Sequence, residues 1–415
     1  MNIAENKILS LSSPLTLPCG AVLNNRLLKS AMSEQLGDKH HNPVPGLQTL
    51  YSTWADGGQA VNVTGNIMVD RGALGEPGNV VLDEDSDLEA FKRWTQAGTR
   101  GQTHLWPQLN HPGKQAPGFL YPEPVAPSAI PLEGEVSVNF NPPRALLEEE
   151  IWQIIERFAT SARLAKECGF TGVQIHGAHG YLVNQFLSPR HNQRQDQWGG
   201  SLENRMRFVR EVYAAIRRQV GDLFPVAIKL NSADFMDREF GEDDCIQVIK
   251  TLADDGIDLV EISGGNYEKM AFLQETASSE RTARREAFFI EFAENLRQVC
   301  KVPLVVTGGF RSARGMLEAL HDDATDMIGL GRSLVIDPAF ARKVINNVHH
   351  GIHLQRRSTG FRKLDTLTMI DVQWYQQQII RLSRGLPSKP EMSEWTALLK
   401  MCWSLGGRAF QRTRA

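Results

Sequence analysis

Residues 148–176 read EEEIWQIIERFATSARLAKECGFTGVQIH, a long helical pattern followed by a short strand pattern. Apolar side chains recur at the i, i+3, i+4, i+7 spacing of one helix face over Glu148–Cys168. A turn then leads into Gly172–His176, a run with β-branched residues that indicates a strand. A helix and a strand in direct succession are the repeating parts of α/β folds.

Further runs of the same two kinds extend over most of the chain. The predicted strands are Arg26–Ala31, Ala60–Gly65, His104–Leu109, Gly172–His176, Pro225–Leu230, Leu259–Ile262, Pro303–Thr307 and Met327–Gly329. Most read as continuous apolar runs, which suits parallel strands covered on both faces. Amphipathic helices are also predicted at Asn204–Val220 and Phe288–Cys300. Eight strands alternating with helices over about 330 residues predict a (β/α)8 TIM barrel.

A doubly wound open sheet is the alternative fold. It would carry a G-x-G-x-x-G turn after its first strand, but Ser30–Gln35 contains no glycine. The barrel is therefore favoured, with residues 1–348 as the barrel and residues 349–415 as a C-terminal helical extension. Two helices are predicted in the extension, at Asp371–Arg384 and Glu391–Leu405.

Charge is unevenly divided between these two parts. The whole chain has a formal net charge of −3, whereas residues 351–415 hold eleven Lys and Arg but four Asp and Glu. We expect the extension to pack on the acidic barrel or on a second subunit, with its arginines facing carboxylates or solvent. It thereby offers a surface for a homo-oligomer.

Composition excludes several classes of protein. A near-neutral total charge gives no basic field for binding nucleic acid. The five cysteines lie tens of residues apart without a C-x-x-C pair, which favours a reducing, cytoplasmic location over a disulfide scaffold or metal ribbon. The first ten residues are polar and no run of 18 apolar residues occurs, so neither a signal core nor a membrane span is expected.

Residues 111–147 separate the third and fourth predicted strands by an unusually long connection. They contain eight of the 20 prolines. So long an irregular stretch is more often functional than filler, and in a barrel it would lie on the C-terminal face with the active site.

The densest group of reactive side chains follows the fourth predicted strand. His176, His179 and Tyr181 stand within six residues, where imidazole N–H groups can polarise a carbonyl and a phenol can donate a proton. A metal site is disfavoured, because no carboxylate or cysteine completes the H-x-x-H pair at a typical spacing. Histidines that only make structural hydrogen bonds remain the alternative.

Paired glycines follow the seventh and eighth predicted strands. Gly308 and Gly309 come after one strand, and Gly329 and Gly331 come at the end of the next and are followed by Arg332. Barrels commonly hold phosphate there on backbone N–H groups, and the guanidinium would add a charged contact. Tight turns are the simpler explanation for either pair taken alone.

These motifs together resemble the old yellow enzyme family. The resemblance covers most of residues 10–345 and is strongest from His176 to Arg205. Further matching motifs are Leu23-Asn24-Asn25-Arg26, Gln108-Leu109-Asn110-His111-Pro112-Gly113, Lys229, Thr307-Gly308-Gly309 and Gly329-Leu330-Gly331-Arg332. The family uses FMN and NADH or NADPH, so the resemblance implies both cofactors.

The resemblance also implies a role for individual residues around the flavin. Lys229 would face the N1/O2 edge, Gln108 would contact the pyrimidine edge, and Ser33 would lie near O4/N5. The complete expected FMN-binding set is Ala31, Met32, Ser33, Gly65, Asn66, Gln108, Lys229, Gly308, Gly309, Gly331 and Arg332. Ala31, Ser33, Gly65, Asn66 and Lys229 differ from the residues that the family most often has there, which affects redox potential and substrate choice more than reaction class.

The implied activity is that of an ene-reductase, which passes hydride from NAD(P)H through flavin N5 to the β-carbon of an activated alkene such as an enone. His176 and His179 would bind the carbonyl oxygen, and Tyr181 would protonate the α-carbon. Three alternatives stay open: a flavin-linked dehydrogenase, a phosphate-binding lyase or isomerase without flavin, and a non-catalytic flavin-binding protein.

Overall fold

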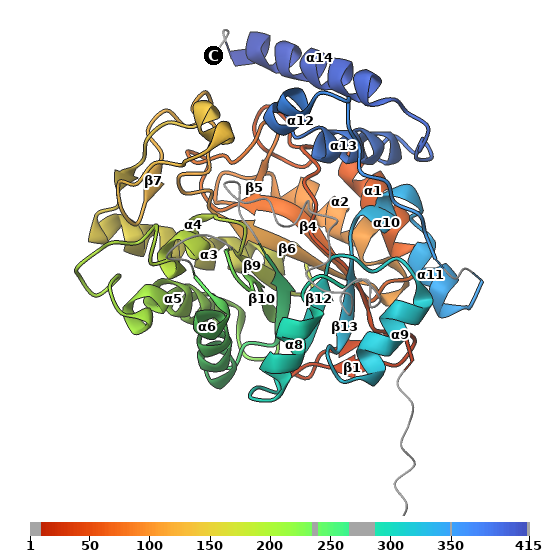
Figure 1. Ribbon diagram of the computed structural model, residues 1–415, viewed down its shortest axis with the longest axis horizontal. Helices are drawn as coiled ribbons and strands as arrows, with labels where there is room; N and C mark the ends of the chain where they lie inside the picture. The colour runs from red at the N-terminus through yellow and green to blue at the C-terminus, as the bar shows by residue number, and fades with distance from the viewer. Residues whose placement is uncertain (1–9, 235–239, 265–286, 349–350, 413–415) are drawn as a thin grey trace, which may run out of the picture.

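Eight parallel strands close into a barrel in the computed structural model, which describes residues 10–234, 240–264, 287–348 and 351–412 (Figure 1). The strands are β3 (Leu27–Lys29), β4 (Val61–Met68), β6 (His104–Asn110), β9 (Val173–Gly177), β10 (Val226–Asn231), β11 (Leu259–Ser263), β12 (Leu304–Thr307) and β13 (Met327–Leu330). They are ordered β3-β13-β12-β11-β10-β9-β6-β4, and β4 pairs back onto β3. The predicted TIM barrel is confirmed, with every predicted strand present within a few residues of its expected ends.

Helices surround this barrel. They are α1 (Pro45–Ala55), α2 (Leu88–Gly98), α3 (Glu148–Glu167), α4 (Leu182–Leu187), α5 (Leu202–Val220), α6 (Glu242–Asp254), α8 (Ile290–Arg297), α9 (Ala313–His321), α10 (Arg332–Ile336) and α11 (Phe340–Ile345). The start of α5 is set by Ser201, whose hydroxyl accepts from Asn204 N, and Gly221 ends it with a φ of +75°. The three amphipathic helices predicted in the barrel correspond to α3, α5 and α8.

Side chains on the strands alternate between two environments. On β10, Ala227 belongs to an apolar cluster in the barrel interior, while Ile228 belongs to the larger cluster beneath the helices. Lys229, two residues after Ala227, returns to the interior and is buried. The barrel is therefore apolar near the amino ends of its strands and polar near their carboxyl ends, where the site lies.

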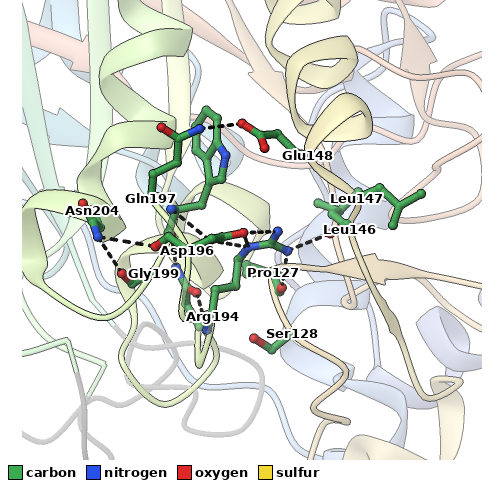
Figure 2. A network of polar contacts seen from close by, with 12 residues as sticks. Pro127, Ser128, Leu146, Leu147, Glu148, Arg194, Asp196, Gln197, Gly199 and Asn204 are labelled. Atoms are coloured by element: carbon green, nitrogen blue, oxygen red, sulfur yellow. Dashed lines mark hydrogen bonds and ion pairs between the residues drawn. The ribbon is translucent and has the colours of Figure 1, made fainter.

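The proline-rich segment 111–147 forms a small substructure with β7 (Val125–Ala126), the short helix η2 (Glu135–Asn139) and β8 (Arg144–Ala145). Arg194 holds this segment in place (Figure 2). It donates to the carbonyls of Pro127 and Leu146 at 3.0 and 2.7 Å and forms an ion pair with Asp196. This segment and residues 190–205 do not line the cavity found in the described residues. The contribution of 111–147 to the active site stays a prediction; within the segment, Gln115 Nε2 donates to His179 O at 2.8 Å.

The remaining short elements lie at the edges. β1 (Leu15–Thr16) and β2 (Val22–Leu23) form an antiparallel pair, β5 (Val80–Val81) extends the sheet beside β4, and η1 (Arg100–Gln102) precedes β6. No helix among the described residues is both long enough and apolar enough to cross a bilayer.

The C-terminal extension folds as α12 (Arg362–Thr368), α13 (Ile370–Leu382) and α14 (Glu394–Arg412). Both predicted helices are present. Helix α13 packs against α1 and α10 of the barrel, and α14 lies outside it at the edge of the molecule (Figure 1). Trp374 on α13 is fully buried and its Nε1 donates to Met392 O at 2.8 Å. The division into two units at residue 348 stays a prediction, and residues 349–350 at that boundary lie outside the described ones.

Candidate active site

A cavity of about 300 Å³ opens at the carboxyl ends of the barrel strands, a volume within the range of small-molecule sites. All fourteen residues that the sequence singles out line this one cavity. They are Ala31, Met32, Ser33, Gly65, Asn66, Gln108, His176, His179, Tyr181, Lys229, Gly308, Gly309, Gly331 and Arg332. They come from seven strands or the loops that follow them, so only closure of the barrel brings them together.

Three ring side chains form one side of the cavity. The His176 ring centre lies 5.2 Å from that of His179 and 4.8 Å from that of Tyr181, in edge-to-face arrangements. Asn66 Nδ2 donates to the Tyr181 hydroxyl at 3.4 Å. The backbone bends sharply here, since His179 has a φ of +60° and Gly180 a φ of +80°. This left-handed turn lets both histidines and the tyrosine face the same space.

Hydrogen bonds from the surroundings orient the two imidazoles. His176 Nδ1 accepts from Ala178 N at 3.3 Å, which leaves the ring proton on Nε2. His179 Nε2 lies 2.8 Å from the Ser263 hydroxyl, and its backbone N–H donates to Asn231 Oδ1 at 3.1 Å. Burial, and secondarily the charge of Lys229, hold the pKa of each histidine well below its ordinary value. Neutral imidazoles that each carry one N–H are suited to donating a hydrogen bond to a carbonyl oxygen.

The packing around residue 65 explains why this position is a glycine. A Cβ there would lie 2.1 Å from Glu34 Oε2, and the backbone N–H of Gly65 donates to Glu34 Oε1 at 2.8 Å. Tyr51 also donates to this carboxylate. Burial raises the pKa of Glu34, while the charge of nearby Lys29 opposes that rise. The carboxylate of Glu34 thus fills the space that a side chain on residue 65 would need.

Backbone donors and cations gather on the opposite side of the cavity. Gly308 and Gly309 have φ values of +111° and +102°, conformations that favour glycine. Arg332 and Arg311 line the cavity beside them, and Lys229 lies at its floor. This donor set fits FMN: the glycine turn with Arg332 would hold the phosphate, while Lys229 and Gln108 would meet the polar edge of the ring.

The Ser33 hydroxyl has a hydrogen-bond partner that the sequence did not predict. Its hydroxyl donates to Glu76 Oε1, and Gln35 Nε2 donates to the other oxygen of the same carboxylate at 3.0 Å. Glu76 also lines the cavity. It lies 43 residues after Ser33 in the chain, outside every recognisable motif, so local pattern carried no signal for it.

The C-terminal extension contributes a further wall that sequence reasoning missed. Its cavity-lining residues are Leu354, Asp371, Val372, Tyr375, Gln376 and Ile379. Arg332 Nη1 lies 3.3 Å from Asp371 Oδ2, and the Arg332 guanidinium is 5.8 Å from the centre of the Tyr375 ring. At this contact the expected charges are reversed: the arginine belongs to the barrel and the carboxylate to the extension. Net charge did not predict it, because one acidic residue of a basic segment makes the contact.

The described residues contain no cluster of three or more His, Cys, Asp or Glu side chains that could hold a metal ion.

Comparisons with known proteins identify the family of the chain. Residues 10–350 match the NADH:flavin oxidoreductase / NADH oxidase family. An NADH-dependent flavin oxidoreductase, iliE, from Hypocrea jecorina (strain QM6a) is 36% identical over 358 residues, which cover 81% of this chain and 89% of that protein. The iliE of Neonectria sp. (strain DH2) is also 36% identical, but the chain spans 46% of its length.

Among solved structures, a 2-naphthoyl-CoA reductase in complex with 2-naphthoyl-CoA superposes with a TM-score of 0.76 at 26% identity, over 81% of this chain and 52% of that one. The family match ends at residue 350, so the wall formed by the extension lies outside it. The chain belongs to the NADH:flavin oxidoreductase / NADH oxidase family, of old yellow enzyme type, with FMN as its cofactor and a nicotinamide as hydride donor.

Proposed function

We propose that the protein is an NAD(P)H-dependent ene-reductase that reduces the C=C bond of α,β-unsaturated carbonyl compounds or similarly activated alkenes. The observation that carries the proposal is the convergence of two neutral imidazoles and a phenol on one cavity, which the residues expected to bind flavin also line. An enone needs a donor at its carbonyl oxygen and a proton at its α-carbon, and these groups supply both.

His176 and His179 would bind and polarise the carbonyl oxygen. Because the ring proton of His176 is on Nε2, this nitrogen can donate to the oxygen without a change of protonation. His179 would add a second donor. Two neutral donors stabilise the negative charge that develops on the oxygen, and they release the product more readily than a fixed cation would.

Tyr181 would give the proton. Its ring packs against His176, and its hydroxyl accepts from Asn66 at 3.4 Å. A phenol stays protonated at neutral pH and is therefore a competent acid. When bound, FMN supplies the hydride chemistry; the protein residues bind, orient and exclude water from the cavity.

The decisive test is spectroscopic and kinetic. The purified protein should show the flavin absorption spectrum, lose it anaerobically with NADH or NADPH, and regain it when an enone such as 2-cyclohexenone is added. Reduction by only one nicotinamide would define the preferred donor. A flavin that is reduced by nicotinamide but not reoxidised by any of a panel of activated alkenes would contradict the proposal.

Two alternatives have distinct outcomes in the same assay. A flavin-linked dehydrogenase would be reduced by a saturated amine or ketone and would need another electron acceptor. A non-catalytic flavoprotein would bind FMN without being reduced by either nicotinamide. A colourless protein that binds no added FMN would contradict the family's cofactor assignment for this chain.

We further propose that the protein acts in the cytoplasm and that it forms a homo-oligomer through the extension. Exposed apolar side chains on and beside α12 and α14 support the second point: Phe361, Leu367, Leu399 and Trp403. Sedimentation of the full chain, compared with a Leu399→Glu/Trp403→Glu variant, tests it. A monomer in both cases would contradict it.

A further inference from the structure

A buried carboxylate lies beneath the floor of the cavity. Glu261 on β11 is completely enclosed and is the register neighbour of Lys229 on β10. Its Oε1 is 3.1 Å from Lys229 Nζ and accepts from the Thr307 hydroxyl at 2.7 Å. Lys229 and Thr307 line the cavity, whereas Glu261 is not among the described residues that do so. The carboxylate therefore contacts the floor from below.

The second oxygen of Glu261 leads to Gln108 on another strand. Glu261 Oε2 accepts from Gln174 Nε2 at 2.8 Å, and Gln174 Oε1 accepts from Gln108 Nε2 at 2.7 Å. A carboxylate can only accept hydrogen bonds, so it obliges Gln174 to present its NH2 group. The oxygen of Gln174 must then face Gln108, which commits one N–H of Gln108. One charge thereby fixes the orientation of two amides.

Stability alone does not account for such a residue. Replacing a buried ion pair by apolar side chains is often neutral or stabilising, so a barrel core does not need one. Burial by itself would raise the pKa of Glu261, but Lys229, Thr307 and Gln174 together hold that pKa below its usual value. Lys29 also lies close enough to interact with this charge. The carboxylate is thus kept ionised by its neighbours, two of which, Lys229 and Thr307, line the cavity.

We propose that Glu261 is a positioning residue that sets the orientation and the electrostatic environment of the cofactor's pyrimidine edge, through Lys229 on one side and Gln108 on the other. The inference rests on the proposed placement of FMN in this cavity. The reduced cofactor carries negative charge at its N1/O2 edge, so a carboxylate beneath Lys229 offsets part of the stabilisation that the lysine provides.

Glu261→Gln in the FMN-loaded enzyme tests the charge. We expect the midpoint potential of the bound flavin to rise by at least about 30 mV, which is a tenfold change in the affinity for reduced relative to oxidised flavin. In a Lys229→Met background the same substitution should shift the potential far less, because its effect passes through the lysine. A purely structural carboxylate would give no potential shift, or the same shift in both backgrounds, and either result would overturn the proposal.

Gln174→Leu tests the second arm separately. It leaves the pair of Lys229 and Glu261 intact but removes the partner of the Gln108 amide, so we expect the Kd for FMN to rise about tenfold while the potential shift stays below that of Glu261→Gln. Glu261→Asp keeps the charge and replaces Glu261→Gln in this test if that variant does not fold. The midpoint potential of its bound flavin should remain nearer to that of the unaltered enzyme.

The readouts separate the two proposals. An unaltered protein that binds FMN but is not reoxidised by alkenes contradicts the ene-reductase assignment and leaves the potential measurement valid. An unaltered enzyme that reduces enones while Glu261→Gln keeps its potential contradicts the role of Glu261 alone. An unchanged Kd for FMN in Gln174→Leu would remove Gln108 from the arrangement.

Discussion

Single residues account for the direction of each hydrogen bond in the site. His176 Nδ1 accepts from Ala178 N, so its ring proton is on Nε2, and the Tyr181 hydroxyl accepts from Asn66 Nδ2. The tautomer of His176 is thus set by a neighbouring backbone group. Hydrogen-bond donors that are oriented before the substrate binds account for much of an enzyme's rate enhancement.

Tyr181→Phe isolates the proton donor. Removal of the hydroxyl should leave FMN binding and NAD(P)H oxidation in place but slow reoxidation by an enone about 10²- to 10⁴-fold, the range for one general acid. Stopped-flow absorbance of the two half-reactions measures this. Equal reoxidation rates in both enzymes would show that another group, or water, delivers the proton.

The pair of histidines is tested by ligand binding. His176→Ala/His179→Ala should lose the affinity for a phenol such as 4-hydroxybenzaldehyde, because both donors to its oxygen are removed. Titration followed by the flavin absorption spectrum gives the Kd. Asn204 lies in the first turn of helix α5 and does not line the cavity. The Asn204→Ala variant is therefore the control and should bind the phenol normally. Unchanged phenol binding in the double variant would place the anion site elsewhere.

At the scale of elements, the unexpected part is helix α13. It brings a wall to the cavity and a carboxylate to Arg332, although it begins 38 residues beyond that arginine. The sequence predicted the helix from its periodicity, but not its position. A helix pattern records which face is apolar and leaves open which surface covers that face.

Trp374→Ala tests whether the docking of α13 matters for the site. Losing a fully buried tryptophan costs roughly 3–5 kcal/mol, and its hydrogen bond to Met392 O is lost as well. We expect the extension to become sensitive to protease and the Kd for FMN to rise at least tenfold, measured by flavin fluorescence.

The exposed Leu386 in the same extension provides the matched control, since Leu386→Ala should change the free energy of unfolding by less than about 0.5 kcal/mol. If Trp374→Ala loosens the extension but leaves FMN affinity unaltered, the wall formed by α13 is not needed for cofactor binding.

At the scale of the whole molecule, buried histidines make stability depend on pH. Burial lowers the pKa of His111 to about 4 and that of His191 to about 2. It also lowers the pKa values of His176 and His179. An unfolded histidine titrates near 6.5. Below that pH the unfolded chain binds more protons than the folded one, so stability falls as the pH drops. The raised pKa of Glu34 acts in the opposite direction.

We therefore expect the Tm to fall steadily between pH 6.5 and pH 4.5, with each of these histidines contributing up to about 1.4 kcal/mol per pH unit. Differential scanning calorimetry over this range measures it. His191→Gln removes one titrating group, whose Nδ1 lies 2.9 Å from Lys114 Nζ, and should flatten the slope. A Tm that does not change from pH 6.5 to pH 4.5 would contradict the expectation.

The sequence by itself predicted the barrel and the helices that cover it, and together with the family resemblance it named fourteen residues that line one cavity. Strands and helices follow from local periodicity, and a closed parallel barrel places the carboxyl ends of all strands at one rim. Residues after successive strands must therefore meet. His176 and Arg332 could be assigned to the same cavity for this reason alone.

Only the tertiary structure decided which distant groups complete that site. Glu34 beneath Gly65, Glu76 beside Ser33, Glu261 beneath Lys229 and Asp371 beside Arg332 are all long-range contacts between elements. It also placed the proline-rich segment 111–147 outside the cavity lining. Such contacts depend on strand register and on how helices pack, and neither is encoded in the local pattern around any one of these residues.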